Sequence, residues 1–436
     1  MEVEEAPIPR GVSRDDPLRR HAAGDDGSDR DAPPGRAGPP ESLDPLAEDT
    51  DVGPILAEEM ESPDEPVDEA RLDACHVPMM THSGRVRVPC SLETRPTTRR
   101  APAWGRGPAA REPAHRTCSM RYRPNMIPRR PGRPLGVGIQ LPEVEREVRW
   151  PELRAIARTA EQVGLDSIWL GDHLLYRYDS GETRGPWEAW TTLAGLAEAT
   201  ERVALGPLVA ATAFHSPFML AKQAATVDEI SGGRLVLGIG AGWNPVEFAA
   251  LGAPFDHRIS RFEEAFTIVR TLLAEGAIDF EGEFFSARDA ELLPRSARPG
   301  GPPILIGSSG PRMLAATILH VAAWNAWYAD TENSPGGVPA LRDVVDGAAR
   351  AAGRDPGEIE RTVAVQVRMP GGTGRVMGDT SERQSIVPLQ GTSAQLAEEW
   401  RAYAREGIGH VQLVLDPITE ASVAALAPAL ELLDRG

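Results

Sequence analysis

The sequence contains one adjacent pair of side chains suited to proton transfer, Asp172 and His173. A carboxylate beside an imidazole can hold or pass a proton near neutral pH, because histidine titrates in that range. The pair directly follows the short apolar run 166–170, which is typical of a buried strand. The plain alternative is that Asp172 caps a turn and His173 is an ordinary loop residue, so the pair alone identifies no activity.

A glycine-rich segment follows another apolar run, 234–239. Gly240 and Gly242 lie at its end, and glycines let backbone amides approach a flat ring or a phosphate closely. The spacing is G-x-G-x-G, and Trp243 and Asn244 come next where a dinucleotide-binding motif would start a helix. The segment is therefore a poor match to that motif.

A glycine–serine turn follows the apolar run 303–306. Ser308, Ser309 and Gly310 precede Pro311, which is expected to open a helix. Two hydroxyl groups and the free amides of a helix start favour a phosphate as ligand. An ordinary strand-to-helix turn would use the same residues, and the segment by itself does not separate the two interpretations.

Other catalytic equipment is missing from the pattern. The nine histidines are scattered, with no spacing typical of metal ligands, so no metal site is predicted. Cys75, Cys90 and Cys118 all precede the region of alternating runs, and no G-x-S-x-G motif occurs. Without a metal or a nucleophile, a site with a phosphate cradle would depend on the reactivity of a bound redox cofactor.

These segments require a scaffold that brings several strand ends together. From residue 135, apolar runs of strand length alternate with amphipathic stretches of helix length, and eight pairs of this kind predict a (β/α)₈ TIM barrel. Each polar segment follows a strand, so all would meet on the carboxyl-terminal rim, where barrel enzymes keep their active sites. The expected strands are 135–140, 166–170, 203–210, 234–239, 303–306, 321–324, 362–367 and 410–415. The expected helices are 151–163, 187–200, 217–230, 258–273, one from 311, 340–352, 393–405 and 419–433, with a hairpin at 278–285.

The first 133 residues differ in composition from the barrel region, 134–436. They hold 20 of the 40 prolines and no phenylalanine, so they lack the apolar surface needed for a folded core. Their charge is segregated, acidic over 1–74 and arginine-rich over 75–133. We expect a disordered N-terminal extension, or upstream sequence before a start at Met120 or Met126, and not a nucleic-acid-binding arm.

The barrel region carries a net charge of −14, since the whole chain is −18 and the two parts of the extension are −15 and +11. An acidic surface argues against a nucleic-acid partner. Neither a signal-peptide core nor an apolar run of membrane length occurs in the sequence. We therefore predict a cytoplasmic protein without a membrane segment.

Six blocks of the sequence, in this order, resemble the bacterial luciferase-like family of flavin- and deazaflavin-dependent oxidoreductases. The resemblance is strong over 135–330 and weaker beyond it. The blocks are GVGIQLP (136–142), AEQVGLDSIWLGDHL (160–174), PWEAWTTLAGLAEATERVALGPLV (186–209), SPFMLAKQAATVDEISGGRLVLGIGAGWNPVEFAALG (216–252), RFEEAF (261–266) and PPILIGSSGPRML (302–314).

The resemblance implies roles for individual residues. His173, with Asp172 beside it, would meet the isoalloxazine or deazaflavin ring. His173 would donate a proton or polarise the reacting group. Leu208-Val209 matches the place where relatives carry a non-prolyl cis peptide beneath the ring. The cofactor-binding residues that the resemblance implies are Leu208, Val209, Gly240, Gly242, Ser308, Ser309 and Gly310.

Two enzyme classes are consistent with this resemblance. The first is a flavin-dependent monooxygenase acting on paired donors, in which reduced FMN, supplied by a partner reductase, reacts with oxygen and a small organic substrate. The second is a dehydrogenase or reductase that uses the deazaflavin coenzyme F-420, transfers hydride and does not react with oxygen. A non-catalytic binding barrel is the third interpretation. We expect the monooxygenase, with F-420 chemistry as the alternative.

The sequence does not indicate the substrate. The loop 370–391 has no recognisable signature. Its arginines, Arg375 and Arg383, would suit an anionic substrate, but we expect them to be solvated. Relatives of this family are often dimers, so the resemblance also implies a homodimer.

Overall fold

A computed structural model of the protein describes residues 127, 129–178, 180–296, 298–375 and 386–435. The disorder predicted for 1–126 lies outside these residues. Of the segment before 134, Ile127 and Arg133 are buried against the barrel. The folded unit therefore includes several residues that their composition assigned to the extension, because Arg133 takes part in a buried ion-pair cluster.

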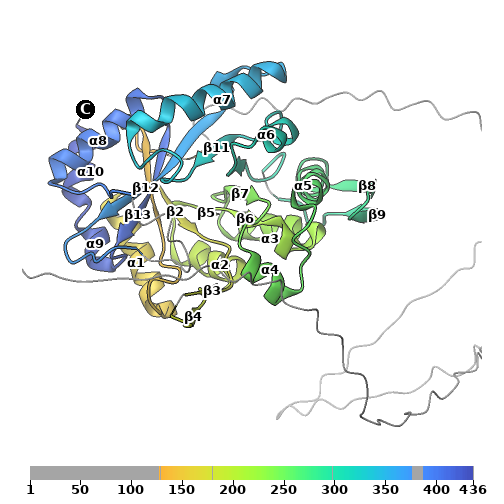
Figure 1. The fold of residues 1–436 in the computed structure, drawn as a ribbon, viewed down its shortest axis with the longest axis horizontal. Helices are drawn as coiled ribbons and strands as arrows, with labels where there is room; N and C mark the ends of the chain where they lie inside the picture. The colour runs from red at the N-terminus through yellow and green to blue at the C-terminus, as the bar shows by residue number, and fades with distance from the viewer. Residues whose placement is uncertain (1–126, 128, 179, 297, 376–385, 436) are drawn as a thin grey trace, which may run out of the picture. The chain divides into compact units, whose positions relative to one another are not determined.

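Nine parallel strands of the described residues form one sheet (Figure 1): β1 (Gly136–Gln140), β2 (Ser167–Leu170), β5 (Ala204–Pro207), β6 (Ala210–Ala211), β7 (Leu237–Gly240), β10 (Ile304–Ile306), β11 (Ala323–Ala326), β12 (Glu360–Arg368) and β13 (His410–Asp416). Their order is β5-β2-β1-β13-β12-β11-β10-β7-β6. β5 and β6 are two parts of one barrel strand, so the sheet begins and ends on the same stretch of chain. A bridge between Leu205 and Leu235 closes the circle. The predicted (β/α)₈ TIM barrel is confirmed.

The third barrel strand was predicted as one run, 203–210, and the structure divides it. The peptide bond between Leu208 and Val209 is cis, and it separates β5 from β6. β5 pairs with β2, whereas β6 pairs with β7. The hydrophobic pattern does not mark the break, because both parts are buried and the run is apolar throughout.

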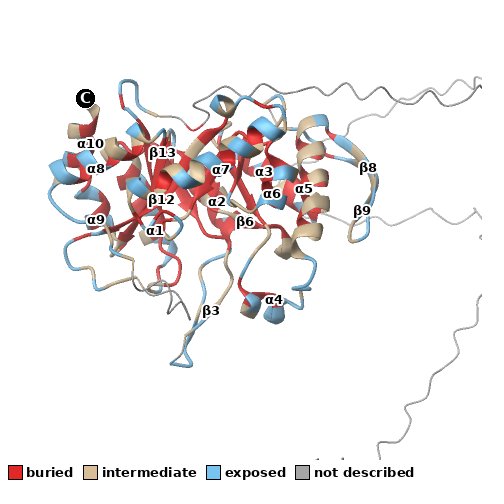
Figure 2. Cartoon of the chain, turned by 45° about the horizontal axis from the view of Figure 1, so that its top comes forward, coloured by how far each residue is buried: buried red, intermediate tan, exposed pale blue. Residues whose placement is uncertain are grey.

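Helices surround the strands and turn their buried sides toward them (Figure 2). The longer ones are α1 (Trp150–Val163), α2 (Ala189–Ala199), α3 (Pro217–Ile230), α5 (Arg258–Glu275), α7 (Val338–Ala351) and α8 (Ser393–Arg405). In α1, Pro151 lies in the first turn, where its missing N–H costs nothing, and Gly164 ends the helix at a φ of 94°. Leu153 and Ile156, one turn apart, are buried on its inner face.

The shorter helices are α4 (Pro245–Leu251), α6 (Pro311–Thr317), α9 (Glu420–Ala424) and α10 (Ala427–Asp434). The closing helix predicted over 419–433 is wrong as one element, since it is divided into α9 and α10. Pro428 lies near the start of α10. Its ring and missing N–H are compatible with a first turn but not with the middle of a continuous helix.

Two hairpins and three short turns complete the described elements. The predicted hairpin at 278–285 is confirmed as β8 (Ala277–Glu281) and β9 (Ser286–Glu291). A second hairpin, β3 (Tyr176–Arg177) with β4 (Thr183–Arg184), follows β2, and α4 follows β7. These rim segments were not predicted, because they are too short to show periodicity. The 3₁₀ turns are η1 (Thr212–Phe214), η2 (Pro335–Gly337) and η3 (Pro356–Glu358).

The amino-terminal ends of the strands, which we call the barrel base, enclose a buried polar group. His410 Nε2 lies 2.7 Å from Ser167 Oγ, and Trp169 Nε1 donates to the same oxygen at 2.6 Å. A Cβ on Gly136 would overlap the His410 ring, and one on Gly138 would overlap Ser167. Glycines in β1 therefore create the space that the histidine fills.

Arg133 ties the chain before β1 to two other segments at the base. Its side chain is fully buried and forms ion pairs with Asp166 at 2.7 Å and with Asp434 at 2.6 Å. Asp166 also accepts the backbone N–H of Val137 at 2.9 Å. The cluster joins the start of β1, the start of β2 and the end of α10.

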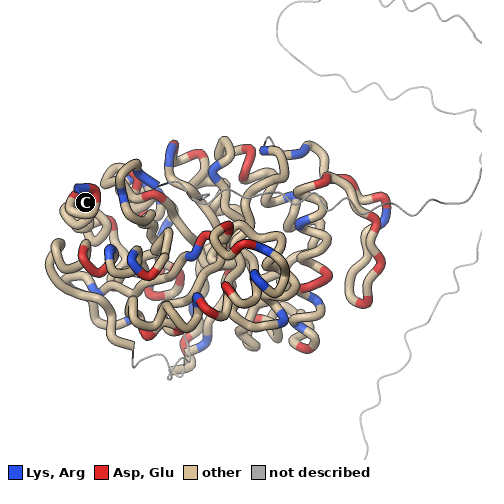
Figure 3. The backbone as a smooth tube through the Cα atoms, turned by 90° about the horizontal axis from the view of Figure 1, so that it is seen from above, with Lys and Arg blue, Asp and Glu red and all other residues tan. Residues whose placement is uncertain are grey.

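Acidic and basic residues are interspersed along the chain around the barrel (Figure 3). Exposed ion pairs such as Arg312–Glu263 and Arg435–Glu431 are part of this pattern. Among the described residues, none of the helices combines the length and the apolar character needed to cross a membrane.

Candidate active site

A cavity of about 470 Å³, the main cavity, opens at the carboxyl-terminal ends of the strands. A smaller cavity of about 300 Å³ shares several of its walls. The predicted residues that line the main cavity are Asp172, His173, Leu208, Val209, Gly240, Gly242 and Ser308. Those that line the smaller cavity are Leu208, Val209, Ser308, Ser309 and Gly310. The structure thus brings every residue selected from the sequence to one continuous site on the rim.

Glu247 in α4 is the partner of His173. Its Oε2 lies 2.9 Å from His173 Nδ1, and its Oε1 accepts the backbone N–H groups of Leu174 at 2.6 Å and Leu175 at 3.3 Å. Burial lowers the pKa of His173, but the hydrogen bond to Glu247 and the surrounding carboxylates, Glu143 foremost, raise it more, so the pKa lies above its ordinary value. Burial raises the pKa of Glu247, but these donors outweigh it and keep the pKa below normal. The pair therefore favours a proton on the imidazole and a charged carboxylate.

Asp172 has different partners from its neighbour in the sequence. Its Oδ2 accepts the backbone N–H of Ala211 at 2.9 Å and lies 2.7 Å from His215 Nε2. Ala211 belongs to β6, directly after the cis peptide bond. Asp172 therefore holds the segment that follows this bond and does not pair with His173.

Three glycines surround the side chain of Val209. A Cβ on Gly240 would lie 2.8 Å from Val209 Cγ2, and those on Gly238 and Gly307 would each lie 3.1 Å from Cγ1. These distances are too short for ordinary contact. Gly240 lines the cavity as predicted, and its missing side chain also makes room for Val209.

The segment Ser308–Gly310 lines the smaller cavity, and two hydrogen bonds fix its position. Trp324 Nε1 donates to the Ser308 carbonyl at 3.0 Å, and the Gly310 N–H donates to Ser308 Oγ at 3.2 Å. A Cβ on Gly310 would have Ser308 Oγ, at 3.6 Å, as its one neighbour within 4 Å among the described residues. The segment is thus fixed in place while open space lies in front of it.

A buried ion-pair cluster, Glu143–Arg375–Glu145, also borders the main cavity. Arg375 Nη2 lies 3.3 Å from Glu143 Oε2, and its Nε lies 2.6 Å from Glu145 Oε1. The Arg375 side chain is 1% exposed, so the expectation that it is solvated is wrong. The two carboxylates fix it among buried groups, whereas Arg383 lies outside the described residues. Burial raises the pKa of Glu143 above its ordinary value, although the neighbouring positive charges oppose this.

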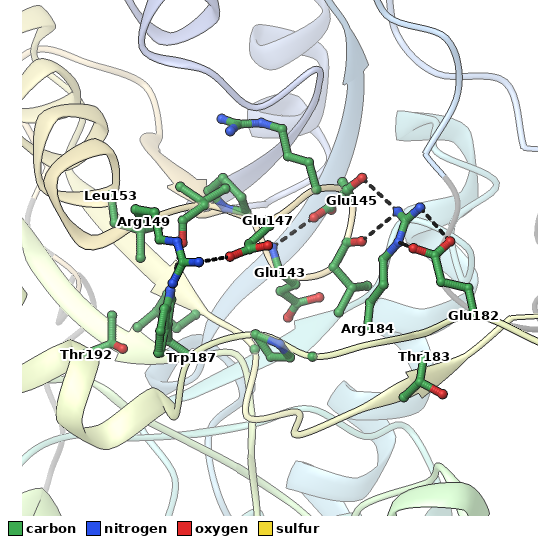
Figure 4. Close-up of a pocket in the computed structure, with 18 residues that line it drawn as sticks. Glu143, Glu145, Glu147, Arg149, Leu153, Glu182, Thr183, Arg184, Trp187 and Thr192 are labelled. Atoms are coloured by element: carbon green, nitrogen blue, oxygen red, sulfur yellow. Dashed lines mark hydrogen bonds and ion pairs between the residues drawn. The ribbon is translucent and has the colours of Figure 1, made fainter.

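A third cavity, of about 580 Å³, lies beside the main one, between the segments 142–149 and 182–187 (Figure 4). Ion pairs of Arg149 with Glu147, at 2.5 Å, and of Arg184 with Glu182, at 2.7 Å, line it. These two ion pairs are largely solvated, and the cavity contains none of the residues selected from the sequence. Although it is larger, we assign the active site to the main cavity, which holds the buried pair of His173.

Sequence reasoning missed several residues of the site: Glu143, Glu145, His215, Glu247 and Arg375. Glu143 and Glu145 follow β1 closely, so the rule that polar residues after a strand lie on the rim could have found them. Glu247 and Arg375 come from a short helix and a long loop. Both lie too far along the chain from the preceding strand for that rule to identify them.

The site fits a flat ring with a phosphorylated tail. The main cavity offers His173 and a glycine-lined wall, and the smaller cavity offers the hydroxyl groups of Ser308 and Ser309. Trp327 borders both cavities, and its buried Nε1 has no hydrogen-bond partner among the described residues. Such a donor is costly unless an acceptor satisfies it, and a carbonyl or phosphate oxygen would do so.

The fold and this site define a (β/α)₈-barrel protein with two adjoining cavities on the carboxyl-terminal rim. The family model of the luciferase-like monooxygenases matches residues 135–370, more than half of the chain. The protein therefore belongs to the luciferase-like monooxygenase family, as the sequence blocks indicated.

Individual relatives agree with this assignment. A 5,10-methylenetetrahydromethanopterin reductase of Archaeoglobus fulgidus is 36% identical over 168 residues, 38% of this chain and 46% of that protein. An F420-dependent glucose-6-phosphate dehydrogenase of Amycolatopsis mediterranei is 34% identical over 166 residues, 37% of this chain and 48% of that protein. The chain spans about half the length of these curated relatives.

A solved structure shows the same fold. The F420-dependent secondary alcohol dehydrogenase in complex with an F420-acetone adduct superimposes with a TM-score of 0.59 at 19% identity. The superposition covers 69% of this chain and 99% of that one. It confirms the luciferase-like barrel architecture.

Proposed function

We propose that the protein is an oxidoreductase that uses the deazaflavin coenzyme F-420 to move hydride to or from a small organic substrate. The observation that carries the proposal is the His173–Glu247 pair in a rim cavity that continues to the segment Ser308–Gly310. The choice of deazaflavin over FMN rests on the relatives, one of which is named for F420. We therefore propose the F-420-dependent dehydrogenase or reductase, which was the alternative in the sequence analysis, ahead of the monooxygenase expected there.

In this proposal, the ring lies in the main cavity and the phosphate in the smaller one. Leu208, Val209 and Gly240 would border the ring, together with Gly242. Ser308, Ser309 and Gly310 would hold the phosphate through hydroxyl groups and backbone amides. A bound deazaflavin would supply hydride chemistry without reaction with oxygen.

His173 is the proton carrier in this proposal. Glu247 engages Nδ1 and fixes the orientation of the ring, which leaves Nε2 to exchange a proton with a substrate oxygen. Asp172 is a positioning residue, since it acts through Ala211 and His215.

Cofactor binding tests the proposal directly. The full chain is titrated with oxidised F-420, oxidised FMN and reduced FMN, and tryptophan fluorescence is followed, because Trp243 and Trp327 line the main cavity. We expect saturable quenching by F-420 at a lower concentration than by either form of FMN. Quenching by none of the three would refute a redox cofactor at this site.

A flavin-dependent monooxygenase is the second candidate, and the description of the matching family favours it. That activity would need reduced FMN from a partner reductase and would consume oxygen. Tight binding of reduced FMN together with oxygen uptake would select it over the deazaflavin enzyme. A homodimer is part of both proposals, and the mass of the protein in solution tests it.

A further inference from the structure

The charged side chains around His173 are paired with one another. His173 pairs with Glu247, and Asp172 pairs with His215. We take the part of the main cavity beside His173 as the substrate site, a step that rests on the proposed function, because Ser309 and Gly310 line the smaller cavity instead. The pairing means that neither carboxylate is available as a free charge for a ligand.

Arg375 lines the main cavity and carries a guanidinium group that suits an anion, but two carboxylates neutralise its charge. Glu143 and Glu145 both contact its guanidinium group, and the Arg375 and Glu143 side chains are at most 3% exposed. With both carboxylates charged, the cluster has a net charge of −1. With Glu143 protonated, the charge is zero, so the cluster attracts no anion in either state.

Among the described residues, Arg258 is the other arginine that lines the main cavity, and it is half-buried. It is the first residue of α5, and its guanidinium carbon lies 3.9 Å from the centre of the Phe255 ring. Phe255 is itself exposed. Because Arg258 is half-buried beside this exposed ring, water and salt reach its charge and reduce its attraction for an anion in the cavity.

The remaining walls near His173 are mostly apolar or aromatic. The ring centres of Tyr176 and Trp243 lie 4.9 and 5.7 Å from that of His173. Other residues of this kind that line the cavity are Phe214, Ile259, Met313 and Tyr328. Such walls bind the apolar body of a ligand, and the few polar groups orient its reacting end.

We propose that the substrate is an uncharged alcohol or carbonyl compound with an apolar body, and that the site excludes anions such as sugar phosphates. In the direction of oxidation, the hydride leaves the alcohol carbon for the oxidised deazaflavin. The hydroxyl proton goes to Nε2 of His173 in its neutral form, and the carbon–oxygen single bond becomes a carbonyl. In the direction of reduction, the protonated His173 gives this proton back to the carbonyl oxygen. A relative named as a glucose-6-phosphate dehydrogenase takes, by that name, a phosphate ester. The Glu143–Arg375–Glu145 cluster makes that ligand unfavourable here.

Matched probes test the exclusion of anions. The full chain, loaded with F-420, is titrated with cyclohexanol and cyclohexanecarboxylate, and separately with glucose and glucose 6-phosphate. Tryptophan fluorescence reports binding, and the absorbance of the cofactor reports oxidation of the alcohol. We expect cyclohexanol to bind at least tenfold more tightly than the carboxylate, and glucose 6-phosphate to bind no better than glucose.

Glu145→Gln removes one carboxylate from the cluster and should raise the affinity for cyclohexanecarboxylate at least tenfold. Glu147→Gln is the matched control, because Glu147 lies on the same segment but pairs with the exposed Arg149. It should change neither affinity. The comparison of probes on the unaltered protein needs no variant, so the proposal stays testable if Glu145→Gln does not fold.

Equal or tighter binding of the anionic probes to the unaltered protein would overturn the inference. An anion preference that disappears in Arg258→Gln would overturn it as well and would assign the anion to Arg258. If F-420 itself does not bind, the proposed function fails. If F-420 binds and anions are preferred, the substrate inference alone fails.

Discussion

His173 and His410 lie at opposite ends of the same barrel, and their surroundings change their pKa values in opposite directions. At the rim, burial lowers the pKa of His173, but Glu247 and nearby carboxylates raise it further, to above its ordinary value. At the base, burial and then the charges of Arg133 and Arg129 lower the pKa of His410 to about 3. The rim histidine lines a cavity, whereas the base histidine packs against Ser167 and the glycines of β1.

The difference shows how the barrel separates chemistry from stability. At the rim, long segments after the strands bring carboxylates to the edge of a cavity, where a ligand can meet them. At the base, Arg133 pairs with Asp166 and Asp434 across three segments of the chain. Changes at the base should therefore act on folding, and changes at the rim should act on binding and turnover.

The largest expected effect is that of Arg133→Met at the base. It leaves Asp166 buried without its ion pair, which should lower the free energy of unfolding by about 3–5 kcal/mol. Denaturant unfolding measures this loss. The folded fraction should bind F-420 with unchanged affinity. Arg435→Met, which removes an exposed pair with Glu431, is the control and should cost about 0.5 kcal/mol or less. Equal effects of the two variants would contradict the importance of the base cluster.

His173→Gln should have the largest effect at the rim. A glutamine keeps a polar contact with Glu247 but neither gains nor loses a proton near neutral pH, so turnover should fall roughly 100-fold or more. The free energy of unfolding should change by about 1 kcal/mol, because Glu247 keeps its backbone donors. His257→Gln, at an exposed position before α5, serves as the control. Full turnover in His173→Gln would remove His173 from the proposed chemistry.

His410 should make the stability fall as the pH is lowered. Below about pH 6.5 the unfolded chain binds a proton that the buried ring refuses until about pH 3. This one group therefore contributes a loss of up to about 1.4 kcal/mol per pH unit between these limits. In His410→Asn, the slope of the free energy of unfolding against pH should be smaller by this amount. Parallel curves for His410→Asn and the unaltered protein would show that His410 is not buried in its neutral form.

Gly310→Asp should have the smallest of these effects and act on cofactor binding alone. A carboxylate in front of Ser308 would repel the phosphate and weaken F-420 binding about tenfold or more, or roughly 1.4 kcal/mol. Gly310→Ala is the matched control, because the added methyl group makes only an ordinary contact with Ser308 Oγ, at 3.6 Å. The melting temperature should not change in either variant. Unchanged affinity in Gly310→Asp would place the phosphate elsewhere.

Local pattern predicted the helices with clear ends well. The helices expected at 217–230 and 393–405 have these bounds in the structure. Proline opens the first, and a capping box at Thr392 opens the second, so each start has a local physical cause. The pattern failed where the cause is not local: the apolar run 203–210 was predicted as one strand but serves two. The cis peptide bond at Leu208-Val209 is confirmed, but the resemblance implied it and the pattern did not.

The candidate site was also predicted only where its residues have a local relation to a strand. Asp172, His173 and Ser308 directly follow strands, and the barrel geometry alone brings such positions together. Glu247 and Arg375 reach the cavity from segments that the pattern left without structure. Their partners, His173 and Glu143, are distant in sequence, so no spacing could reveal the pairs.

The sequence by itself determined the alternation of strands and helices, the rim on which the polar segments meet and the family blocks, because these depend on neighbours along the chain. The tertiary structure decided that Asp172 and His173 serve different partners, that Arg375 is neutralised, and that His173 and His410 hold protons differently. A pKa and the availability of a charge depend on the groups that surround a side chain in space. Those groups come from distant segments, and only the folded barrel brings them together.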